Sequence, residues 1–475
     1  MNTFNKKSLY AAVAGLSALG VTGAANAVSV NPDGLGQALI YPYYTVRDGA
    51  VAGQPYNSLL SVVNSTASAK AVKVRFLEGK NSREVLDFNL YLSPKDVWTA
   101  AIIPTAAGAG IFTTDQSCTT PLVSADAANP TPFVNFAYTG SVADGADTSL
   151  DRTREGYVEI IEMGDVTGTT ATAVTHVNGV PPARPNCSLP NASADTVPGT
   201  GGLFGTITLI DVLAGTDFAL DAVALDAFSS VSLWTPPNSI LPDLSSVNPK
   251  TSVVTAGSTT FVTGWPTPAF SVDPVSAVLM HNNVYNEYVL DAATKSQTDW
   301  VVTMPTKRYY YSGTTVQKLF QRNFTATGAC DDVVLTQYDR EERTVVSQTS
   351  FSPPPPTNTD SLCWEANVIT FNNSNVFGSK NLANVPTTFT NGWASLNFNG
   401  STVPSGVHTL VGGASTTFNT RTGVTGGTTA TTFNGLPTIG FAAITFQNGT
   451  LTTSSGPELS NYGGNVNHKN TRDVH

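Results

Sequence analysis

The chain has 475 residues, which is enough for two or three domains with a sizeable buried core. Hydrophobic residues make up 41% of it, which excludes a disordered polymer, and charged residues make up only 12%. The formal charge of −10 at pH 7 argues against nucleic acid as a partner, because nucleic-acid recognition needs a basic face.

The first residues predict export from the cell. Lys6 and Lys7 precede a largely apolar run that begins at Leu9 and ends in a small-residue cleavage sequence at Ala27. A basic start, a short apolar run and such a cleavage sequence are typical of a secretory signal peptide, here residues 1–27. We therefore expect an exported protein. No later stretch approaches the roughly 20 apolar residues that a transmembrane helix needs.

The segment from Tyr56 to Pro104 has the clearest strand pattern in the chain. Apolar residues alternate with polar ones in runs that end at Asn-, Gly- or Pro-containing turns. Because side chains on a strand alternate between faces, this spacing predicts half-buried antiparallel strands. Four strands in under fifty residues are typical of a β-sandwich or barrel. The predicted strands are Leu59–Val63, Val72–Leu77, Val85–Leu92 and Val97–Ile103.

The rest of the chain adds further strands and two short helices. The segment Thr216–Phe228 has near-helical apolar spacing with Thr216 as a cap, and Asp273-Pro274 is a good helix start. We predict a mainly β fold of two antiparallel β-sandwich-like domains with long Thr/Gly-rich loops and one or two short helices. The domains are an N-terminal β-sandwich at 28–265 and a C-terminal β-rich domain at 266–475. Other expected strands are Gly36–Tyr44, Pro132–Thr139, Arg154–Met163, Leu203–Leu213, Thr298–Pro305, Lys307–Ser312, Glu365–Phe371, Trp393–Phe398 and Ile439–Phe446.

Four cysteines predict disulfide bonds. An even number in an exported chain favours bridges, and Cys118, Cys187, Cys330 and Cys363 allow three pairings. Spacing alone does not choose between them. We favour Cys118–Cys187 and Cys330–Cys363, because this pairing keeps each bridge inside one predicted domain.

One acidic loop is a candidate metal site. Asp144, Asp147 and Asp151 lie in a Gly-containing segment, and calcium takes six to eight oxygen ligands from such loops. The spacing does not match an EF-hand, and Asp/Gly loops are also common turns. Calcium is thus the candidate cofactor, and Asp331-Asp332 is a second acidic pair that could bind it.

Catalytic patterns are weak. None of the five histidines lies in an HExxH motif or beside a G-x-S-x-G serine. Asn286-Glu287 matches the acid/base dipeptide of some glycosidases, but no partner carboxylate can be picked out for Glu287. Six tryptophans could supply sugar-stacking platforms, although core packing is the commoner use of a strand tryptophan. We expect a protein that is not an enzyme.

Several segments spread over the chain are distinctive as strings, among them VKVRFLEGKNSREVLDFNLYLSPKDVWTA, TREGYVEIIEMG, VSAVLMHNNVYNEYVLD, TDWVVTMPTKRYYY, YDREERT with FSPPPP, and LPTIGFAA. They resemble segments of a family of secreted gammaproteobacterial surface proteins, chiefly marine, that includes surface-layer (S-layer) proteins. The resemblance implies export to the cell surface of a Gram-negative bacterium, tiling into a two-dimensional lattice and shedding into biofilm matrix. It carries over no catalytic residue.

The predicted function is therefore structural. We expect self-assembly into a surface layer, with copies of the same chain as partners and outer-membrane lipopolysaccharide as a candidate attachment, bridged by calcium. Two other classes remain open: a secreted polysaccharide-binding or polysaccharide-degrading protein, and an adhesin or pilus-like subunit.

Overall fold

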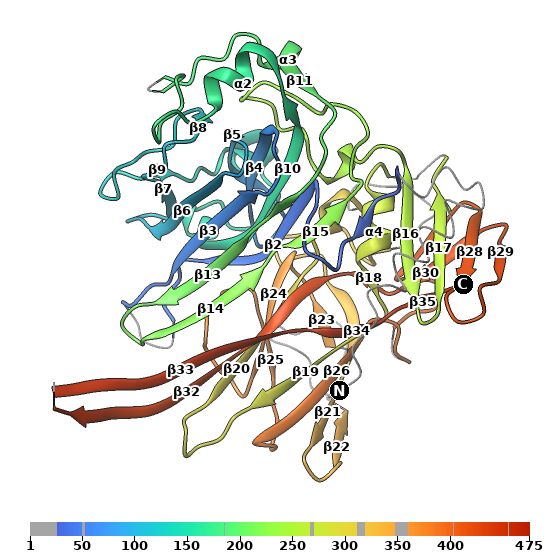
Figure 1. Cartoon of the computed structure of the whole chain (residues 1–475). Helices are drawn as coiled ribbons and strands as arrows, with labels where there is room; N and C mark the ends of the chain where they lie inside the picture. The colour runs from blue at the N-terminus through green and yellow to red at the C-terminus, as the bar shows by residue number, and fades with distance from the viewer. Residues whose placement is uncertain are drawn as a thin grey trace.

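A computed structural model describes residues 26–49, 53–184, 186–266, 270–310, 319–346, 360–401, 403–454 and 456–475. The predicted signal peptide, apart from its last two residues, and the proline run of FSPPPP lie outside these ranges. The described chain is mainly β, as predicted, and most of its strands pair antiparallel in several sheets (Figure 1).

Two sheets form a sandwich from the N-terminal half. Sheet 1 has the order β1 (Ser29–Val30), β15 (Val223–Asp226), β2 (Ala38–Thr45), β10 (Glu155–Val166), β4 (Ala69–Glu78), β5 (Glu84–Leu92) and β8 (Cys118–Thr120), with β11 (Thr196–Val197) on β10. Sheet 2 has the order β14 (Thr216–Asp221), β13 (Thr206–Asp211), β3 (Asn57–Asn64), β6 (Val97–Pro104), β7 (Ala109–Phe112) and β9 (Thr131–Pro132), with β12 (Leu203–Phe204) on β3.

A second pair of sheets comes from the C-terminal half. Sheet 3 has the order β22 (Thr344–Val346), β21 (Asp331–Asp339), β26 (Asn391–Asn397), β19 (Asn283–Val289) and β34 (Lys469–Thr471), with β23 (Asp360–Leu362) on β21. Sheet 4 has the order β25 (Leu382–Val385), β24 (Ala366–Phe371), β20 (Gln297–Thr303), β32 (Ile439–Thr453) and β33 (Gly456–Asn467), and its β24–β25 pair is parallel.

Smaller elements complete the described fold. Three small sheets are β16 (Thr251–Ala256), β17 (Thr259–Gly264), β28 (Ser415–Asn419) and β29 (Thr425–Gly427); β18 (Met280–His281) and β31 (Leu436–Pro437); and β27 (Thr409–Gly412), β30 (Thr431–Asn434) and β35 (Asp473–Val474). The α-helices are α2 (Gly168–Val174), α3 (Ala192–Asp195) and α4 (Asp273–Leu279). Short 3-10 helices are η2 (Phe136–Tyr138), η3 (Gly140–Val142), η4 (Leu150–Arg154), η5 (Leu244–Ser246) and η6 (Lys307–Tyr310).

Period-two alternation explains how these sheets stack. On β4, Val74 and Phe76 point into the core between sheets 1 and 2, where Phe88 of β5 packs between Phe76 and Trp98 of β6. On β20 of sheet 4, Val301 belongs to this same core, whereas its neighbour Trp300 belongs to the core between sheets 4 and 3. Sheet 4 is therefore buried on both faces, because consecutive residues of one strand pack into different cores.

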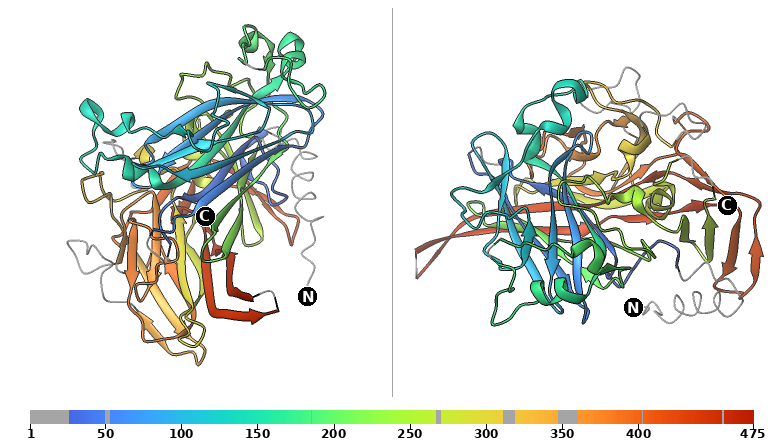
Figure 2. Two further views of the ribbon diagram at one scale, coloured as in Figure 1. Left: turned by 90° about the vertical axis from the view of Figure 1, so that its left-hand side faces the viewer. Right: turned by 90° about the horizontal axis from the view of Figure 1, so that it is seen from above.

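The other face of sheet 1 is also buried. Ile40 of β2 and Tyr157 of β10 share an apolar cluster with Val275 and Val278 of α4, the helix predicted from Asp273-Pro274. Sheets 1 and 4 thus have neighbours on both sides. Among the described residues, sheets 2 and 3 each pack through one face only, and the second face of each carries no packed element of this part of the chain (Figures 1 and 2).

Three sequence predictions about these elements are wrong. The segments Pro132–Thr139 and Lys307–Ser312, expected to be strands, contain the 3-10 helices η2 and η6 in their described residues. The segment Thr216–Phe228, expected to be a helix, forms β14 and β15. Along β14, Thr216, Phe218 and Leu220 are buried while the residues between them are exposed, which is strand and not helix periodicity. Pairing with β13 supplies hydrogen-bond partners for the backbone of β14, so the segment forms a strand although its apolar spacing also fits a helix.

The domain boundary at residue 265 stays a prediction. Packing is continuous across it, since β17 pairs with β28 in the register Val262↔Thr416. Phe377 also packs against Tyr43 and Tyr56, which joins the two halves through shared aromatic contacts.

Candidate interaction surfaces

The predicted calcium ligands do not converge in the structure. Asp144 accepts hydrogen bonds from both Nη atoms of Arg152, at 2.9 and 2.6 Å, and from Nδ2 of Asn81 at 2.8 Å. Burial raises the pKa of Asp144, but these donors bring it below its ordinary value. Asp147 accepts hydrogen bonds from the backbone N–H and the hydroxyl of Ser149, two residues further along the chain. The first two predicted ligands thus stabilise the loop itself.

The third predicted ligand lies in a charged cleft at the junction of the two halves. Asp151 contacts Arg47 at 3.1 Å, Arg154 at 3.2 Å and Lys380 at 3.2 Å. Burial raises the pKa of Asp151, but Arg47 and Lys380 hold it below its ordinary value. The cleft measures about 530 Å³, and its cations already surround this carboxylate. Nearby, Glu155 accepts bonds from Arg47 and from the backbone N–H of Lys380, which ties β10 to the C-terminal half.

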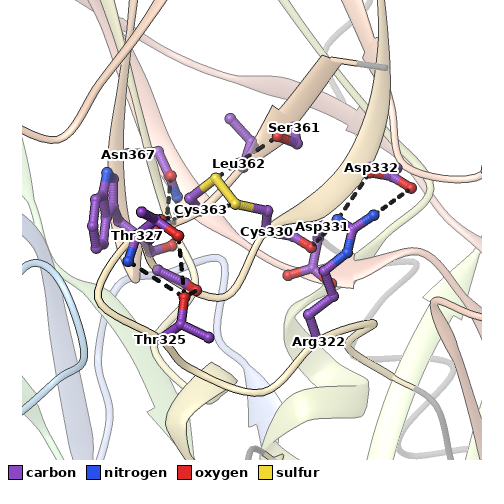
Figure 3. The surroundings of a disulfide bond; sticks show 12 residues. Arg322, Thr325, Thr327, Cys330, Asp331, Asp332, Ser361, Leu362, Cys363 and Asn367 are labelled. Carbon is purple, nitrogen blue, oxygen red and sulfur yellow. Dashed lines mark hydrogen bonds and ion pairs between the residues drawn. A yellow bond between two sulfur atoms is a disulfide. The ribbon is translucent and has the colours of Figure 1, made fainter. Parts of the chain in front are cut away.

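The second acidic pair is also matched by cations. Asp331 lies 2.8 Å from Nζ of Lys307. Asp332 lies 3.1 Å from Nη1 of Arg322 (Figure 3). Arg322 also donates to the carbonyl of Cys330, so its guanidinium holds the backbone of one of the two disulfide cysteines. Among the described residues, no group of three His, Cys, Asp or Glu side chains is arranged to hold a metal ion.

Both predicted disulfides are confirmed. Cys118 of β8 bonds to Cys187 in the loop after α2, and Cys330 before β21 bonds to Cys363 after β23 (Figure 3). Each bridge links segments within one half of the chain, the property on which the pairing was predicted.

Sequence patterns missed one His-Ser-Asp cluster. Ser93 Oγ lies 2.5 Å from Nδ1 of His176, and Oδ2 of Asp96 lies 3.6 Å from the same nitrogen. In a catalytic triad the acid and the nucleophile bond to opposite ring nitrogens, so that the imidazole can pass a proton between them. Here both approach Nδ1, and Ser93 also donates to the carbonyl of Val174, so the cluster fastens α2 to the turn after β5. His281, another candidate base, is buried, and burial lowers its pKa well below the ordinary value.

Most of the six tryptophans pack inside the protein. Trp98 and Trp300 are fully buried, and Trp265 and Trp364 nearly so. Trp393 is 41% exposed on the free face of sheet 3, where Glu287 is its cross-strand neighbour. A groove lined by several tryptophans, as a polysaccharide-degrading enzyme would need, is therefore not formed by these four rings.

The free face of sheet 2 is a continuous apolar and hydroxyl-rich surface. Strand register aligns one outward row across five strands, from Phe112 through Ala101, Leu59 and Thr208 to Ala219. The side chains between them on each strand point into the sandwich core. This surface, which we call the open face, therefore runs across β7, β6, β3, β13 and β14, and it includes Phe204 of β12, which pairs with Val63 of β3.

The open face carries no charge on its three central strands. Leu59 is 43% exposed, Val97 49% and Phe204 41%, which is unusual exposure for large apolar side chains clustered on one sheet. Charges begin only at the edge strand β14, with Asp217 and Asp221. The outward side chains of β3, β6 and β13 are Asn57, Leu59, Ser61, Val63, Val97, Thr99, Ala101, Ile103, Thr206, Thr208 and Ile210.

A long hairpin projects beside the open face. Its strands β32 and β33 leave sheet 4 and extend beyond the body of the molecule (Figure 1). Near its base, Asn461 and Asn465 donate side-chain hydrogen bonds to the carbonyls of Ala214 and Ala219, next to and within the edge strand β14. Farther out, β32 and β33 pair with each other, from Thr450↔Leu459 to Thr453↔Gly456.

Comparison with known protein families, curated proteins and solved structures found no match to this chain. Among the described residues, no helix is both long and apolar enough to cross a membrane.

Proposed function

We propose that this chain is an exported structural protein that assembles with copies of itself into a layer on the surface of a Gram-negative cell. The open face of sheet 2 carries the proposal. A chain with a formal charge of −10 repels its own copies, and that repulsion is smallest where two uncharged surfaces meet. The exposed Leu59, Val97 and Phe204 would gain stability by leaving water in such a contact.

The projecting hairpin supports assembly beyond a closed pair. A sheet of molecules needs at least two different contacts on each copy, and contacts that do not close into a small ring continue indefinitely. The hairpin supplies a second contact surface, because its distal strands extend away from their own body (Figure 1). Two disulfide bonds are typical of a protein that works in an oxidising environment outside the cytoplasm.

Attachment to lipopolysaccharide and a contribution to biofilm matrix are part of the same proposal. Asp144, Asp147 and Asp151 already accept hydrogen bonds or ion pairs from neighbouring residues. Calcium that bridges the protein to lipopolysaccharide would therefore bind between molecules and not at these three carboxylates. An enzyme or an adhesin would instead need a substrate groove or a missing strand, and no observation on the described residues favours either.

Charge placed on the open face tests the proposal. We expect Leu59→Lys combined with Val97→Lys to abolish assembly, because each contact would bring like charges together without water. Val142→Lys is a matched control, since Val142 is also 49% exposed but lies on η3, outside the open face. Negative-stain microscopy and sedimentation velocity would compare the purified proteins. Assembly by the double variant as efficient as in the wild type would refute the role of this face.

A further inference from the structure

The free face of sheet 3 has a different chemistry from the open face. Its inward side chains fill the core against sheet 4, so the alternate residues of β19, β26 and β21 point outward. Register places Glu287, Trp393 and Tyr338 in one cross-strand row. The next row contains Tyr285, Ser395 and Thr336. Three aromatic rings therefore gather on one exposed sheet face.

The rings form a fixed cluster. Trp393 stacks on Tyr338 with ring centroids 4.1 Å apart and an interplanar angle of 10°, and Tyr285 lies 6.2 Å from Trp393 on the neighbouring strand. Tyr338 therefore holds the indole in one orientation, while 41% of Trp393 remains open to water. The cluster spans two strand spacings, or about 10 Å.

Polar side chains surround the cluster, and one of them is a cation, because the exposed Lys469 of β34 lies opposite Tyr285 in the strand register. Asn283 and Asn397 pair across β19 and β26 one row beyond Tyr285, and Ser395 Oγ bonds to Asn283 at 3.4 Å. Amide and hydroxyl groups offer both donors and acceptors at a surface. The carboxylate of Glu287, beside Trp393, adds an acceptor.

We infer that this face binds a neutral polysaccharide. A pyranose ring has an apolar face of C–H groups, which packs on an exposed aromatic ring, and hydroxyls around its rim, which bond to amides, hydroxyls and carboxylates. The aromatic cluster with its rim of Asn, Ser, Thr and Glu supplies both kinds of contact. The net charge of −10 disfavours an anionic polymer, and on this face the Glu287 carboxylate beside Trp393 offsets the Lys469 ammonium opposite Tyr285. This inference goes beyond self-assembly and does not depend on it, because it uses the opposite free sheet.

Native affinity electrophoresis of the full chain tests the inference. Gels would contain laminarin, yeast mannan, soluble starch or hydroxyethylcellulose as neutral probes and alginate as an anionic one. We expect at least one neutral probe to retard the wild type relative to a gel without polysaccharide. Trp393→Ala should raise the apparent Kd about tenfold, the loss expected from one ring-stacking contact. Phe136→Ala, which removes an exposed ring elsewhere, should leave retardation unchanged.

Three results would overturn the inference: no retardation by any neutral probe, retardation by alginate alone, or equal retardation of the wild type and Trp393→Ala. If Trp393→Ala melts at a lower temperature than the wild type, the retardation of Glu287→Ala is compared with the wild type instead, because Glu287 is exposed and lies outside the core. Its retardation should be weaker than that of the wild type, and unchanged retardation would overturn the inference. Microscopy of Leu59→Lys/Val97→Lys separates the two proposals, since that variant should lose assembly but keep polysaccharide binding.

Discussion

The buried pair of Glu159 and Arg75 predicts an unusual dependence of stability on pH. Glu159 lies on the covered face of sheet 1, where Arg75 Nη1 donates to its Oε2 at 2.5 Å and its Oε1 is buried without a hydrogen-bond partner. Burial raises the pKa of Glu159 from 4.5 to about 7, although Arg75 opposes the rise. Between these two values the folded chain binds more protons than the unfolded chain. Stability therefore falls as pH rises through this window.

The size of the effect follows from the two pKa values. A shift from 4.5 to about 7 is worth about 3 kcal/mol above pH 7. The Gln side chain of Glu159→Gln stays neutral at every pH, so the stability of this variant lacks the fall with pH, and any cost of the amide itself is the same at every pH. Between pH 5 and pH 8 the wild type should lose about 2–3 kcal/mol of unfolding free energy relative to Glu159→Gln.

Urea unfolding at pH 5, 6.5 and 8, followed by tryptophan fluorescence, measures this difference. Glu341→Gln is the control, because Glu341 is exposed and should give a curve parallel to the wild type. A difference between wild type and Glu159→Gln that stays constant over the three pH values would refute the reasoning.

Three further predictions concern stability. Arg152→Met leaves Glu78 and Asp144 buried without their cation and should lower the unfolding free energy by about 3–5 kcal/mol. The control Arg154→Met removes a partly exposed ion pair and should lower it by less than about 1 kcal/mol. Equal losses for the two variants in urea unfolding would contradict this prediction. Cys330→Ser opens a bridge between residues 33 apart and should cost about 4 kcal/mol, measured against the oxidised wild type. Chelation with EGTA should leave the Tm of the unassembled protein unchanged, because the acidic loops are satisfied by arginine, lysine and local donors; a fall of several degrees would reveal an internal calcium site.

Local sequence patterns predicted β3 and β6 well, because one face of each strand is buried and the other is open. β4 between them was expected to be half-buried and is buried on both faces, because Lys73 and Arg75 on its second face are covered and pair with carboxylates. The same reasoning failed at Thr216–Phe228, where apolar residues fit both a helix and a strand and pairing with β13 decides. The disulfides were predictable because each bridge is local to one half of the chain.

The candidate surfaces could not be predicted from the sequence. Asp151 contacts Arg47 and Lys380 only because segments that are distant in the sequence lie together in the fold. The spacing of the aspartates alone therefore predicted a metal-binding loop. Trp393 could be assigned to a core or a surface only once sheet 3 was known to have a free face. The charge-free rows of sheet 2 likewise depend on the register of β3 with β6 and β13, which no spacing reveals.

Cryo-electron microscopy of the purified, concentrated protein tests the central claim most directly. We predict a planar array in which the open face is buried between copies, with Leu59 and Val97 in the contact. Single chains at every concentration, or an array that leaves both side chains in solvent, would contradict the account.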